Sequence, residues 1–303
     1  MNILTIVVTY NGEQWIDKCF ASLINSAIPT RILAIDNASS DTTVSSIKER
    51  FPQVQVIETG SNLGFGKANN IGLKIAVEEN ADYVFLLNQD AWIESDAIQK
   101  LVAVAEKNKD YGIISPFHML PENEKIEWYF STYIAPEKCP DLYSDIYVGK
   151  RKELYELPFV NAAAWLISKE CLQRVGGFDP IFPHYGEDVD YCNRVLKKEL
   201  LIGVSPHAVI YHDITYRSWE EIKFSFTNQL IFSIGELKNM RHSFKFCIVN
   251  YCKNRKERIT YLLIFGKWSE MIFMLKVFVV SLKYLPKIYS SRKIARKKLA
   301  YID

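Results

Sequence analysis

A short apolar run at residues 83–87 stops abruptly at Asn88, Gln89 and Asp90. Its aromatic and β-branched side chains are typical of a strand that is buried on both faces of a parallel sheet. Ligands of open α/β sheets bind beyond the carboxyl ends of the strands. Asp90 therefore stands where a catalytic or metal-binding carboxylate is expected. The alternative is that Asp90 closes a turn or caps the helix predicted to begin near Ser95.

The first half of the chain alternates such apolar runs with segments of helical periodicity. Strands are predicted at residues 3–9, 32–35, 54–57, 83–87 and 112–115, and helices at 15–26, 42–50, 66–79 and 95–107. This order predicts an α/β fold with a mainly parallel sheet, right-handed crossover connections and flanking helices.

Three loops at the carboxyl edge of this sheet carry side chains suited to a nucleotide. They contain Tyr10 and Asn11, then Asp36 in the run D-N-A-S-S-D, then residues 62–70. The carboxylate of Asp36 can accept a hydrogen bond from a base N–H or a ribose hydroxyl. The glycine-rich run N-L-G-F-G-K-A-N-N-I-G argues only weakly for a dehydrogenase, because in that class the glycine-rich turn follows the first strand.

The second half is expected to build the other side of the site. Strands are predicted at residues 157–167, 201–205 and 208–211, and helices at 169–175 and from 187 to about 200. Glu187 and Asp188 open the second of these helices. Acidic residues are also ordinary choices in a first helical turn, so the pair alone does not establish catalysis.

Five motifs occur along the chain in a defined order: V-V-T-Y-N, D-N-A-S-S-D, N-L-G-F-G-K-A-N-N-I-G, L-L-N-Q-D and G-G-F-D-P-I-F-P-H-Y-G-E-D-V-D-Y-C-N-R. In this order they resemble the family 2 glycosyltransferases, nearest the bacterial rhamnosyltransferase-like branch, over about residues 1–235. The resemblance implies a GT-A fold, a nucleotide-sugar donor, a divalent metal (Mn²⁺ or Mg²⁺) and inversion at the sugar carbon. Residues 1–116 would then form the nucleotide-sugar half and 117–235 the acceptor half.

The resemblance also implies roles for individual residues. Positions that match the nucleotide and donor site are Thr9, Tyr10, Asn11, Asp36, Asn69 and Asn88. Asp90 is the one carboxylate kept where the family usually has Asp-x-Asp, and His212 matches a histidine near the metal and diphosphate. Asp188 matches the base that deprotonates the acceptor hydroxyl, and Glu187 would position the acceptor.

Charge is distributed unevenly along a chain whose net charge is +2. Residues 238–303 carry 16 Lys and Arg against 3 Asp and Glu, whereas the preceding residues carry 21 against 32. Lys276, Lys283 and Lys287 share one helical face, opposite an apolar surface that includes Ile272, Phe273, Phe278 and Val279, and the basic cluster Arg292, Lys293, Arg296, Lys297 and Lys298 follows.

The region 236–303 is therefore predicted to be helical and to dock on an anionic membrane surface. No uncharged run approaches the roughly 20 residues needed to span a bilayer. The alternatives are a helix packed on the catalytic body or on a second subunit. Nucleic-acid binding is disfavoured, because long aliphatic runs accompany the basic residues and no recognition motif is present.

Cysteine usage and the first residues predict a cytoplasmic protein. The six cysteines include no C-x-x-C pair, and no signal peptide is apparent. Two hypotheses of function remain. One is an inverting glycosyltransferase on the inner face of the cell membrane, which moves a sugar from a UDP- or dTDP-sugar to a lipid-linked or polysaccharide acceptor in cell-surface glycan synthesis. The other is a non-catalytic sugar- or nucleotide-binding protein; the presence of Asp90, Glu187 and Asp188 favours the enzyme.

Overall fold

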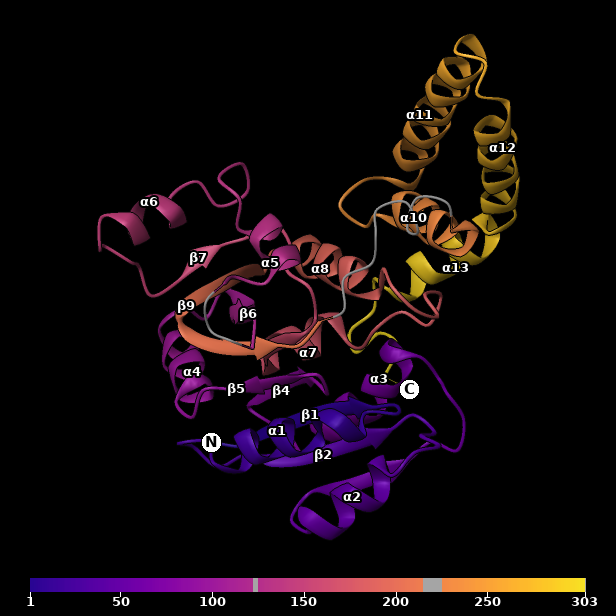
Figure 1. The fold of residues 1–303 in the computed structure, drawn as a ribbon. Helices are drawn as coiled ribbons and strands as arrows, with labels where there is room; N and C mark the ends of the chain where they lie inside the picture. Colours follow the sequence, from indigo (N-terminus) through magenta and orange to yellow (C-terminus); the bar gives the residue numbers. More distant parts are fainter. Residues whose placement is uncertain (122–124, 215–224, 303) are drawn as a thin grey trace.

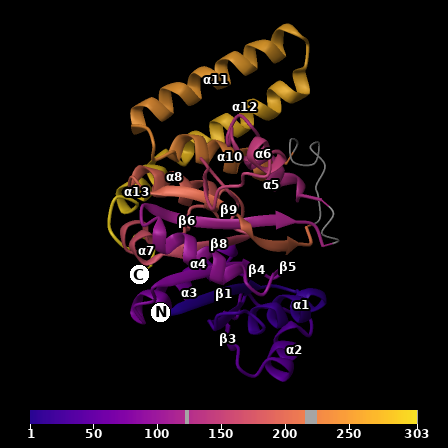
Figure 2. The ribbon, with the colours of Figure 1, turned by 90° about the vertical axis from the view of Figure 1, so that its left-hand side faces the viewer.

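The computed structural model describes residues 1–121, 125–214 and 225–302. Its strands form one nine-stranded sheet in the order β3-β2-β1-β4-β8-β6-β9-β5, with β7 paired to β9 (Figure 1). Helices cover both faces of this sheet, and a group of C-terminal helices extends away from it (Figures 1 and 2).

The first half of the sheet follows the predicted alternation. Its elements are β1 (Ile3–Thr9), α1 (Glu13–Ile24), β2 (Arg31–Asp36), α2 (Thr43–Arg50), β3 (Gln55–Glu58), α3 (Phe65–Glu78) and β4 (Tyr83–Asn88). β1 lies between β2 and β4 and is parallel to both, and β2 is parallel to β3. The side chains of α1 and α2 pack on one face of the sheet and those of α3 on the other, so both faces of β1 and β4 are buried.

Beyond β4 the sheet is mixed. The elements are β5 (Ala91–Ile93), α4 (Ala97–Lys107), β6 (Tyr111–Met119), α5 (Trp128–Tyr133), α6 (Leu142–Tyr147), β7 (Tyr155–Glu156), β8 (Ala164–Ser168), α7 (Lys169–Val175), α8 (Glu187–Lys197) and β9 (Leu201–His212). β8 is antiparallel to β4 and β6, while β9 is parallel to β6 and antiparallel to β5 and β7. The expectation of a mainly parallel sheet therefore holds for β3-β2-β1-β4 and not for the strands that follow.

Three strand predictions in this half were wrong in detail. The strand expected at residues 157–167 begins only at Ala164, and the segment before it is irregular, partly buried chain that contains Pro158. The two strands expected at 201–205 and 208–211 are one strand, β9, whose register with β6 shifts between Ser205 and Val209. Pro206 lies in that irregularity, and proline has no N–H to give to a ladder. The short strand β5 was not predicted.

The C-terminal helices form a second, smaller hydrophobic cluster. They are α10 (Phe226–Lys238), α11 (Phe244–Ile264), α12 (Trp268–Lys283) and α13 (Leu285–Ile294). The buried members of the cluster are Ile181, Phe182, Ile231, Ile234, Leu237, Tyr251 and Ile288. α11 and α12 form a hairpin that extends beyond this cluster (Figure 2). The predicted division near residue 235 falls inside α10, which packs with the other C-terminal helices.

The apolar surface expected along α12 is divided between packing and solvent. Phe278 packs on the second cluster, with its ring stacked on Tyr251 at a centroid distance of 5.8 Å. Phe273 lies edge-on to Phe226, whereas Ile272 and Val279 are exposed. No helix of the described residues is both long and apolar enough to cross a membrane.

A buried ionic network joins these helices to α8. The ammonium of Lys238 contacts the carboxylates of Asp179, at 2.7 Å, and Asp190. Asp190 also accepts a hydrogen bond from Nε of Arg194 at 2.8 Å. Ser291 of α13 donates to Asp179, so α10, α13, α8 and the loop before α8 meet at one point. All of these charged side chains are almost fully buried.

The last residues of the chain return to the sheet. The carbonyl of Ala300 accepts a hydrogen bond from the Gly177 N–H at 2.7 Å, and the carbonyl of Tyr301 accepts one from Nδ2 of Asn70 at 3.0 Å. Gly176 has φ +84°, and a Cβ there would lie 2.1 Å from the Ala300 oxygen. The C-terminal residues thus pack on the sheet domain, against α3 and the end of α7, and do not form a free tail.

Replacement of Lys238 by Met should strongly destabilise the protein. Without the ammonium, the carboxylates of Asp179 and Asp190 lose their shared buried cation, and loss of one member of such a network costs about 3–5 kcal/mol. Urea unfolding measures the change. Lys283→Met is the matched control, because Lys283 is exposed. Equal midpoints for the two variants would show that the network adds little to stability.

Candidate active site

The ends of three parallel strands bring the first site residues together. In the ladder register Thr9 of β1 is opposite Asp36 of β2, and Val8 is opposite Asn88 of β4. Oγ1 of Thr9 donates to the Asp36 carboxylate at 3.0 Å. This is the carboxyl edge, where ligands of such sheets bind.

Asp36 is held by the loop that follows it. Its carboxylate also accepts hydrogen bonds from the backbone N–H of Ser39, at 2.9 Å, and from the Ser39 hydroxyl, at 2.5 Å. The side chain is 2% exposed. Asp36 therefore shapes the loop, and only lone pairs left by these three bonds remain for a ligand.

Tyr10 and Asn11 form a loop that is tied to the end of β4. The backbone N–H of Tyr10 donates to Gln89 at 2.8 Å, and the Gln89 amide donates back to the Tyr10 carbonyl at 3.0 Å. Asn11 has φ 45° and accepts a hydrogen bond from the backbone N–H of Ser40. Gln89 thus fixes the first loop from inside the N-Q-D motif, while the Tyr10 ring is 45% exposed and free to meet a ligand.

The two remaining donor-site predictions lie in different surroundings. Asn88 is half-buried at the end of β4, where its backbone N–H donates to the Ala163 carbonyl at 2.9 Å. Asn69 lies in α3 and is almost fully buried, with Nδ2 donating to the Phe65 carbonyl of its own helix at 3.1 Å. The structure thus brings Asn88 to the edge of the site. It buries the Asn69 side chain against its own helix.

Asp90 and His212 meet at the ends of β4 and β9. The β5–β9 ladder places Ala91 opposite His212, and the Asp213 N–H donates to the Asp90 carbonyl at 2.8 Å. Nε2 of His212 lies 3.4 Å from Oδ1 of Asp90. One divalent cation could bond both atoms at that separation, and an oxygen and an imidazole nitrogen suit Mn²⁺. The pair therefore fits the metal that the resemblance implies.

Two further residues that the sequence did not single out lie beside His212. They are His118, near the end of β6, and Glu127, which caps α5 by accepting from the Tyr129 and Phe130 backbone N–H groups. Ligand atoms of His118, Glu127 and His212 lie within 4.8 Å of one another. Burial lowers the pKa of His118 well below its usual range, and the nearby His212 adds to this effect. No motif or spacing signals this cluster, because the parallel β6–β9 pairing and the turn into α5 bring it together.

Glu187 and Asp188 open α8 after a strained turn. Tyr185 has φ 66° and Gly186 φ 83°, which starts the helix abruptly. A Cβ at Gly66 of α3 would lie 3.6 Å from the Glu187 Cβ, so Glu187 packs against the start of α3 and Asp188 is the next residue along. The pair thus lies next to the segment that follows the third nucleotide loop.

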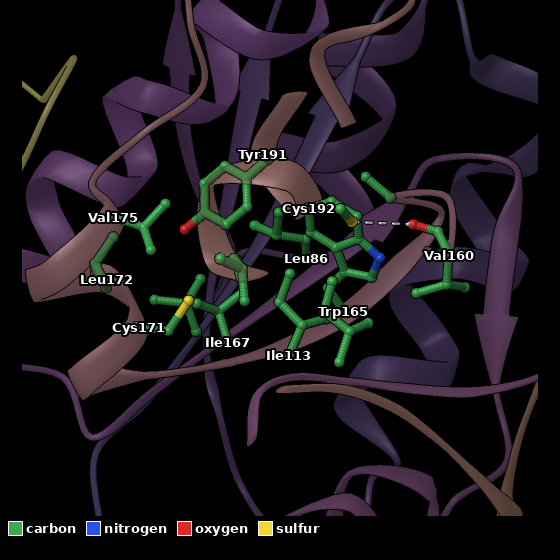
Figure 3. Packing of buried hydrophobic residues seen from close by; sticks show 14 of the residues in the cluster. Leu86, Ile113, Val160, Trp165, Ile167, Cys171, Leu172, Val175, Tyr191 and Cys192 are labelled. Carbon is green, nitrogen blue, oxygen red and sulfur yellow. Dashed lines mark hydrogen bonds between the residues drawn. The ribbon is translucent and has the colours of Figure 1, made fainter. Parts of the chain in front are cut away.

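The core below α8 fixes the direction of this pair. Tyr191 and Cys192, one turn after the pair, face the core beside Trp165 (Figure 3). Sγ of Cys192 contacts the Val160 carbonyl at 3.7 Å, and the Tyr191 hydroxyl donates to the Gly176 carbonyl at 2.9 Å. Glu187 and Asp188 therefore project from the same side of α8 as these anchored side chains.

The two carboxylates of the pair have separated pKa values. Burial raises the pKa of Glu187 from 4.5 to about 8, and the Asp188 charge adds to this. Burial also raises the pKa of Asp188 from 3.8 to about 6, while backbone N–H groups of Val189 and Ala162 oppose the rise. At neutral pH Asp188 is mostly ionised and Glu187 keeps its proton. Such a pair can supply one base and one hydrogen-bond donor.

Comparison with known proteins decides the family. The sequence profile described as Glycosyl transferase family 2 matches residues 5–176, which is more than half of the chain. The chain belongs to this family.

Named relatives agree with this assignment. The chain is 26% identical over 235 residues to an N-acetylglucosaminyl-diphospho-decaprenol L-rhamnosyltransferase of Mycobacterium tuberculosis, covering 68% of this chain and 74% of the relative. It is 26% identical over 220 residues to a dTDP-rhamnosyl transferase of Shigella flexneri, covering 72% and 71%. The chain is thus a glycosyltransferase similar to rhamnosyltransferases, as the motifs predicted.

Solved structures share the fold. A mannosyltransferase of Pyrobaculum calidifontis, in complex with GDP-Man and Mn²⁺, matches with a TM-score of 0.60 at 15% identity, covering 93% of this chain and 87% of that one. TarS 1–349 of S. aureus in complex with UDP-GlcNAc matches with a TM-score of 0.56 at 14% identity, covering 82% and 69%. The predicted GT-A fold is confirmed. The roles of the individual site residues stay predictions.

Replacement of Glu187 by Gln should make stability less dependent on pH. The folded protein keeps a proton on Glu187 that the unfolded chain releases near pH 4.5, so the wild type loses stability as the pH rises from about 4.5 to 8. Gln keeps the neutral form throughout. We expect the variant to melt at least about 2 °C above the wild type at pH 9 and at the same temperature at pH 4.

Thermal melting across this pH range measures the effect. Glu49→Gln is the control, because Glu49 is exposed on α2 and its replacement should leave the pH dependence unchanged. A Glu187→Gln curve parallel to the wild-type curve at all pH values would contradict the raised pKa.

Proposed function

We propose that this glycosyltransferase moves a sugar, with inversion at the sugar carbon, from a UDP- or dTDP-sugar to a hydroxyl of a lipid-linked or polysaccharide acceptor in cell-surface glycan synthesis. The observation that carries the proposal is the position of the Glu187–Asp188 pair, one ionised and one protonated at neutral pH, against the start of α3. That helix follows the third loop of the nucleotide edge.

The donor nucleotide would lie across the ends of β1, β2 and β4. The exposed ring of Tyr10 can stack on a base, and Asn11 and the remaining lone pairs of Asp36 can meet the base or ribose. A pyrimidine is supported by two comparisons. One relative is named a dTDP-rhamnosyl transferase, and one structural neighbour is in complex with UDP-GlcNAc.

A divalent cation would be held by Asp90 and His212 beside the diphosphate. When bound, the cation neutralises charge on the departing nucleoside diphosphate. With a single carboxylate as its anionic ligand, this site should bind the cation weakly unless the donor is also present.

Asp188 would act as the base. Its ionised carboxylate takes the proton of the acceptor hydroxyl as the hydroxyl oxygen attacks the anomeric carbon, and the bond to the diphosphate breaks. Glu187 keeps its proton, and its buried Oε2 has no hydrogen-bond partner among the described residues. It would orient the acceptor or sugar through that atom. A single displacement needs no carboxylate nucleophile, unlike retaining glycoside hydrolysis.

The α11–α12 hairpin would hold the enzyme at an anionic membrane surface on the cytoplasmic side. Its tip exposes Ile264, Phe265 and Trp268, with relative exposures of 72%, 62% and 58%. Lys267 lies between them and is also exposed. Aromatic and aliphatic side chains with a basic neighbour suit the boundary between headgroups and acyl chains.

The proposed docking surface differs from the one expected from the sequence, because the hairpin tip takes the place of some of the residues predicted to contact lipid. Phe278 is packed on the second cluster, and Arg292 donates to the carbonyls of Lys238, Asn239 and His242, so neither can meet lipid. The other basic residues of the expected cluster, Lys293, Arg296, Lys297 and Lys298, are exposed.

Asp188→Asn should abolish most transfer while leaving donor binding intact. Asn keeps the size of the side chain and removes its basicity, so we expect at least a ~100-fold loss of kcat. The wild-type rate should fall below about pH 6, where Asp188 becomes protonated, and the variant should lose this acid limb. Transfer at the normal rate by Asp188→Asn would move the base to another residue, with Glu187 next in line.

Donor binding by the same two proteins tests the other half of the proposal. UDP- and dTDP-sugars with Mn²⁺ should raise the melting temperature of both proteins, because a ligand of the folded state stabilises it. Equal stabilisation by a GDP-sugar would contradict the pyrimidine preference. Slow release of nucleoside diphosphate by the wild type alone would separate an enzyme from a binding protein.

Ile264→Glu/Phe265→Glu should prevent membrane binding. Charged side chains at the tip would have to enter the acyl boundary, so we expect co-sedimentation with anionic vesicles at low salt to be lost. The control is Tyr147→Glu/Val148→Glu, which alters an exposed apolar pair at the end of α6. If wild type and tip variant sediment equally, the hairpin is not the docking surface.

A further inference from the structure

The His118–Glu127–His212 cluster has the features of a metal site in its own right. We propose that these three side chains bind one divalent transition-metal ion of the Zn²⁺ class, in a buried site behind Asp90 that is separate from the cation of the donor diphosphate. The inference goes beyond the proposed sugar transfer, because it needs no nucleotide.

The geometry of the cluster suits a single small ion. One ligand atom from each residue lies within 4.8 Å of those of the other two. Relative exposures are 0% for His118, 0% for Glu127 and 2% for His212. The two imidazole rings are nearly perpendicular, at 86°, with centroids 6.2 Å apart. At the 4.8 Å limit an ion at the centre would lie about 2.8 Å from each atom, so each ligand atom has to move by up to about 0.7 Å to reach the metal-bond length of about 2.0–2.1 Å.

The hydrogen bonds of His118 leave one lone pair without a partner. The Ser115 hydroxyl donates its single proton to the Pro116 carbonyl at 3.0 Å. The 3.1 Å contact between Ser115 and Nε2 of His118 fits either tautomer by itself; with the hydroxyl proton on Pro116, Ser115 accepts and the ring carries its proton on Nε2. Nδ1 of His118 is then a buried lone pair with no hydrogen-bond partner among the described residues. Such an orphaned atom is costly unless something bonds to it.

His212 repeats this arrangement. Its Nε2 faces the Asp90 carboxylate at 3.4 Å, and its Nδ1 is buried with no partner among the described residues. Histidines that bind metals usually donate their other N–H to a carboxylate, a hydroxyl or a carbonyl, which fixes the ring. Ser115 lies at 3.1 Å from Nε2 of His118 in this way, and Oδ1 of Asp90 lies 3.4 Å from Nε2 of His212, in position to take its proton when the ring binds a metal.

Glu127 supplies the charge. Both oxygens of its carboxylate accept a backbone N–H, from Tyr129 at 2.7 Å and from Phe130 at 2.9 Å, which orients the group and leaves further lone pairs. The ion pairs of the described residues include none to Glu127, although it is fully buried. A bound cation would neutralise this charge, and buried charges are normally paired or bound to a metal.

The ligand types select the class of ion. Two imidazoles and one carboxylate are the protein ligands of many zinc sites and suit other divalent transition metals. Mg²⁺ and Ca²⁺ prefer an all-oxygen environment. The competing occupant is a water molecule that donates to the two Nδ1 atoms, and the experiment below separates the two.

A metal ion in this site would weaken binding of the cation that accompanies the donor. This consequence rests on the proposed function. A neutral imidazole has one lone pair, so His212 can serve the inner ion through Nδ1 or the donor cation through Nε2, but not both at once. An occupied inner site should therefore weaken binding of Mn²⁺ with the donor.

Co²⁺ titration of the metal-free full-length protein, without nucleotide, tests the site directly. We expect one equivalent to bind with the visible absorption of four-coordinate Co²⁺, and one equivalent of Zn²⁺ to displace it. His118→Phe should abolish this signal, because Phe keeps the stacking on Phe130 at a centroid distance near that of the native ring, 4.3 Å, and removes both nitrogens. Its metal-free melting temperature should equal or exceed that of the wild type, since a buried orphan is gone.

Three further variants complete the test. Glu127→Gln should weaken Co²⁺ binding at least as much as loss of an outer partner, which costs about 10- to 100-fold, and Asp90→Asn should weaken it by that amount. His207→Gln, at an exposed histidine of β9, should leave it unchanged. Failure of the wild type to bind Co²⁺ would mean that the cluster holds water, and undiminished binding by His118→Phe would assign the ion to another place. Either result overturns the proposal without touching the sugar transfer.

Discussion

The buried ammonium of Lys238 holds the C-terminal helices against α8 and the sheet domain. This ammonium lies between Asp179, from the loop before Glu187 and Asp188, and Asp190, from α8 itself. A buried lysine is stable only with such partners, so α10 cannot leave α8 without exposing three charges to an apolar interior. The helical region and the acidic helix therefore form one rigid unit, closed on the far side by Ser291 of α13.

That rigidity has a consequence for the chemistry. The proposed roles of Asp188 as a base and Glu187 as a neutral hydrogen-bond donor need different surroundings on adjacent residues, and a fixed helix start keeps them different. Tyr191 and Cys192 anchor α8 in the core, so Glu187 remains buried without a partner for one oxygen while Asp188 receives backbone N–H groups. Most of the separation of their pKa values comes from this packing, because the ordinary values of 4.5 and 3.8 differ by less than the values of about 8 and about 6 in the folded protein.

The sequence predicts the parts of the fold that are determined by local patterns of apolar and turn-forming residues. β1, β2, β3 and β4 and their helices follow from apolar runs and turn residues, and the loop residues at their ends fall together because parallel strands end at one edge. Motif resemblance adds the family and the acidic pair. Beyond β4, strand direction depends on long connections, so the antiparallel β8 and the single long β9 were not predictable from periodicity. The charge count of the C-terminal region also misleads, because Lys238 and Arg292 are buried in structural contacts.

His212 shows why part of a site escapes sequence reasoning. The motif resemblance identifies the ring as a neighbour of the metal, but it says nothing of the nitrogen that faces away from Asp90. That nitrogen faces a fully buried interior whose nearest polar groups, His118 and Glu127, come from a strand end and a helix cap with no spacing in common. An interior that was merely structural would gain by placing apolar side chains at these positions, because the two Nδ1 atoms without a partner in the described part of the chain, and a buried carboxylate without an ion pair there, oppose folding. Their presence together is explained when a cation is the missing partner, and the same ring then links the proposed inner site to Asp90.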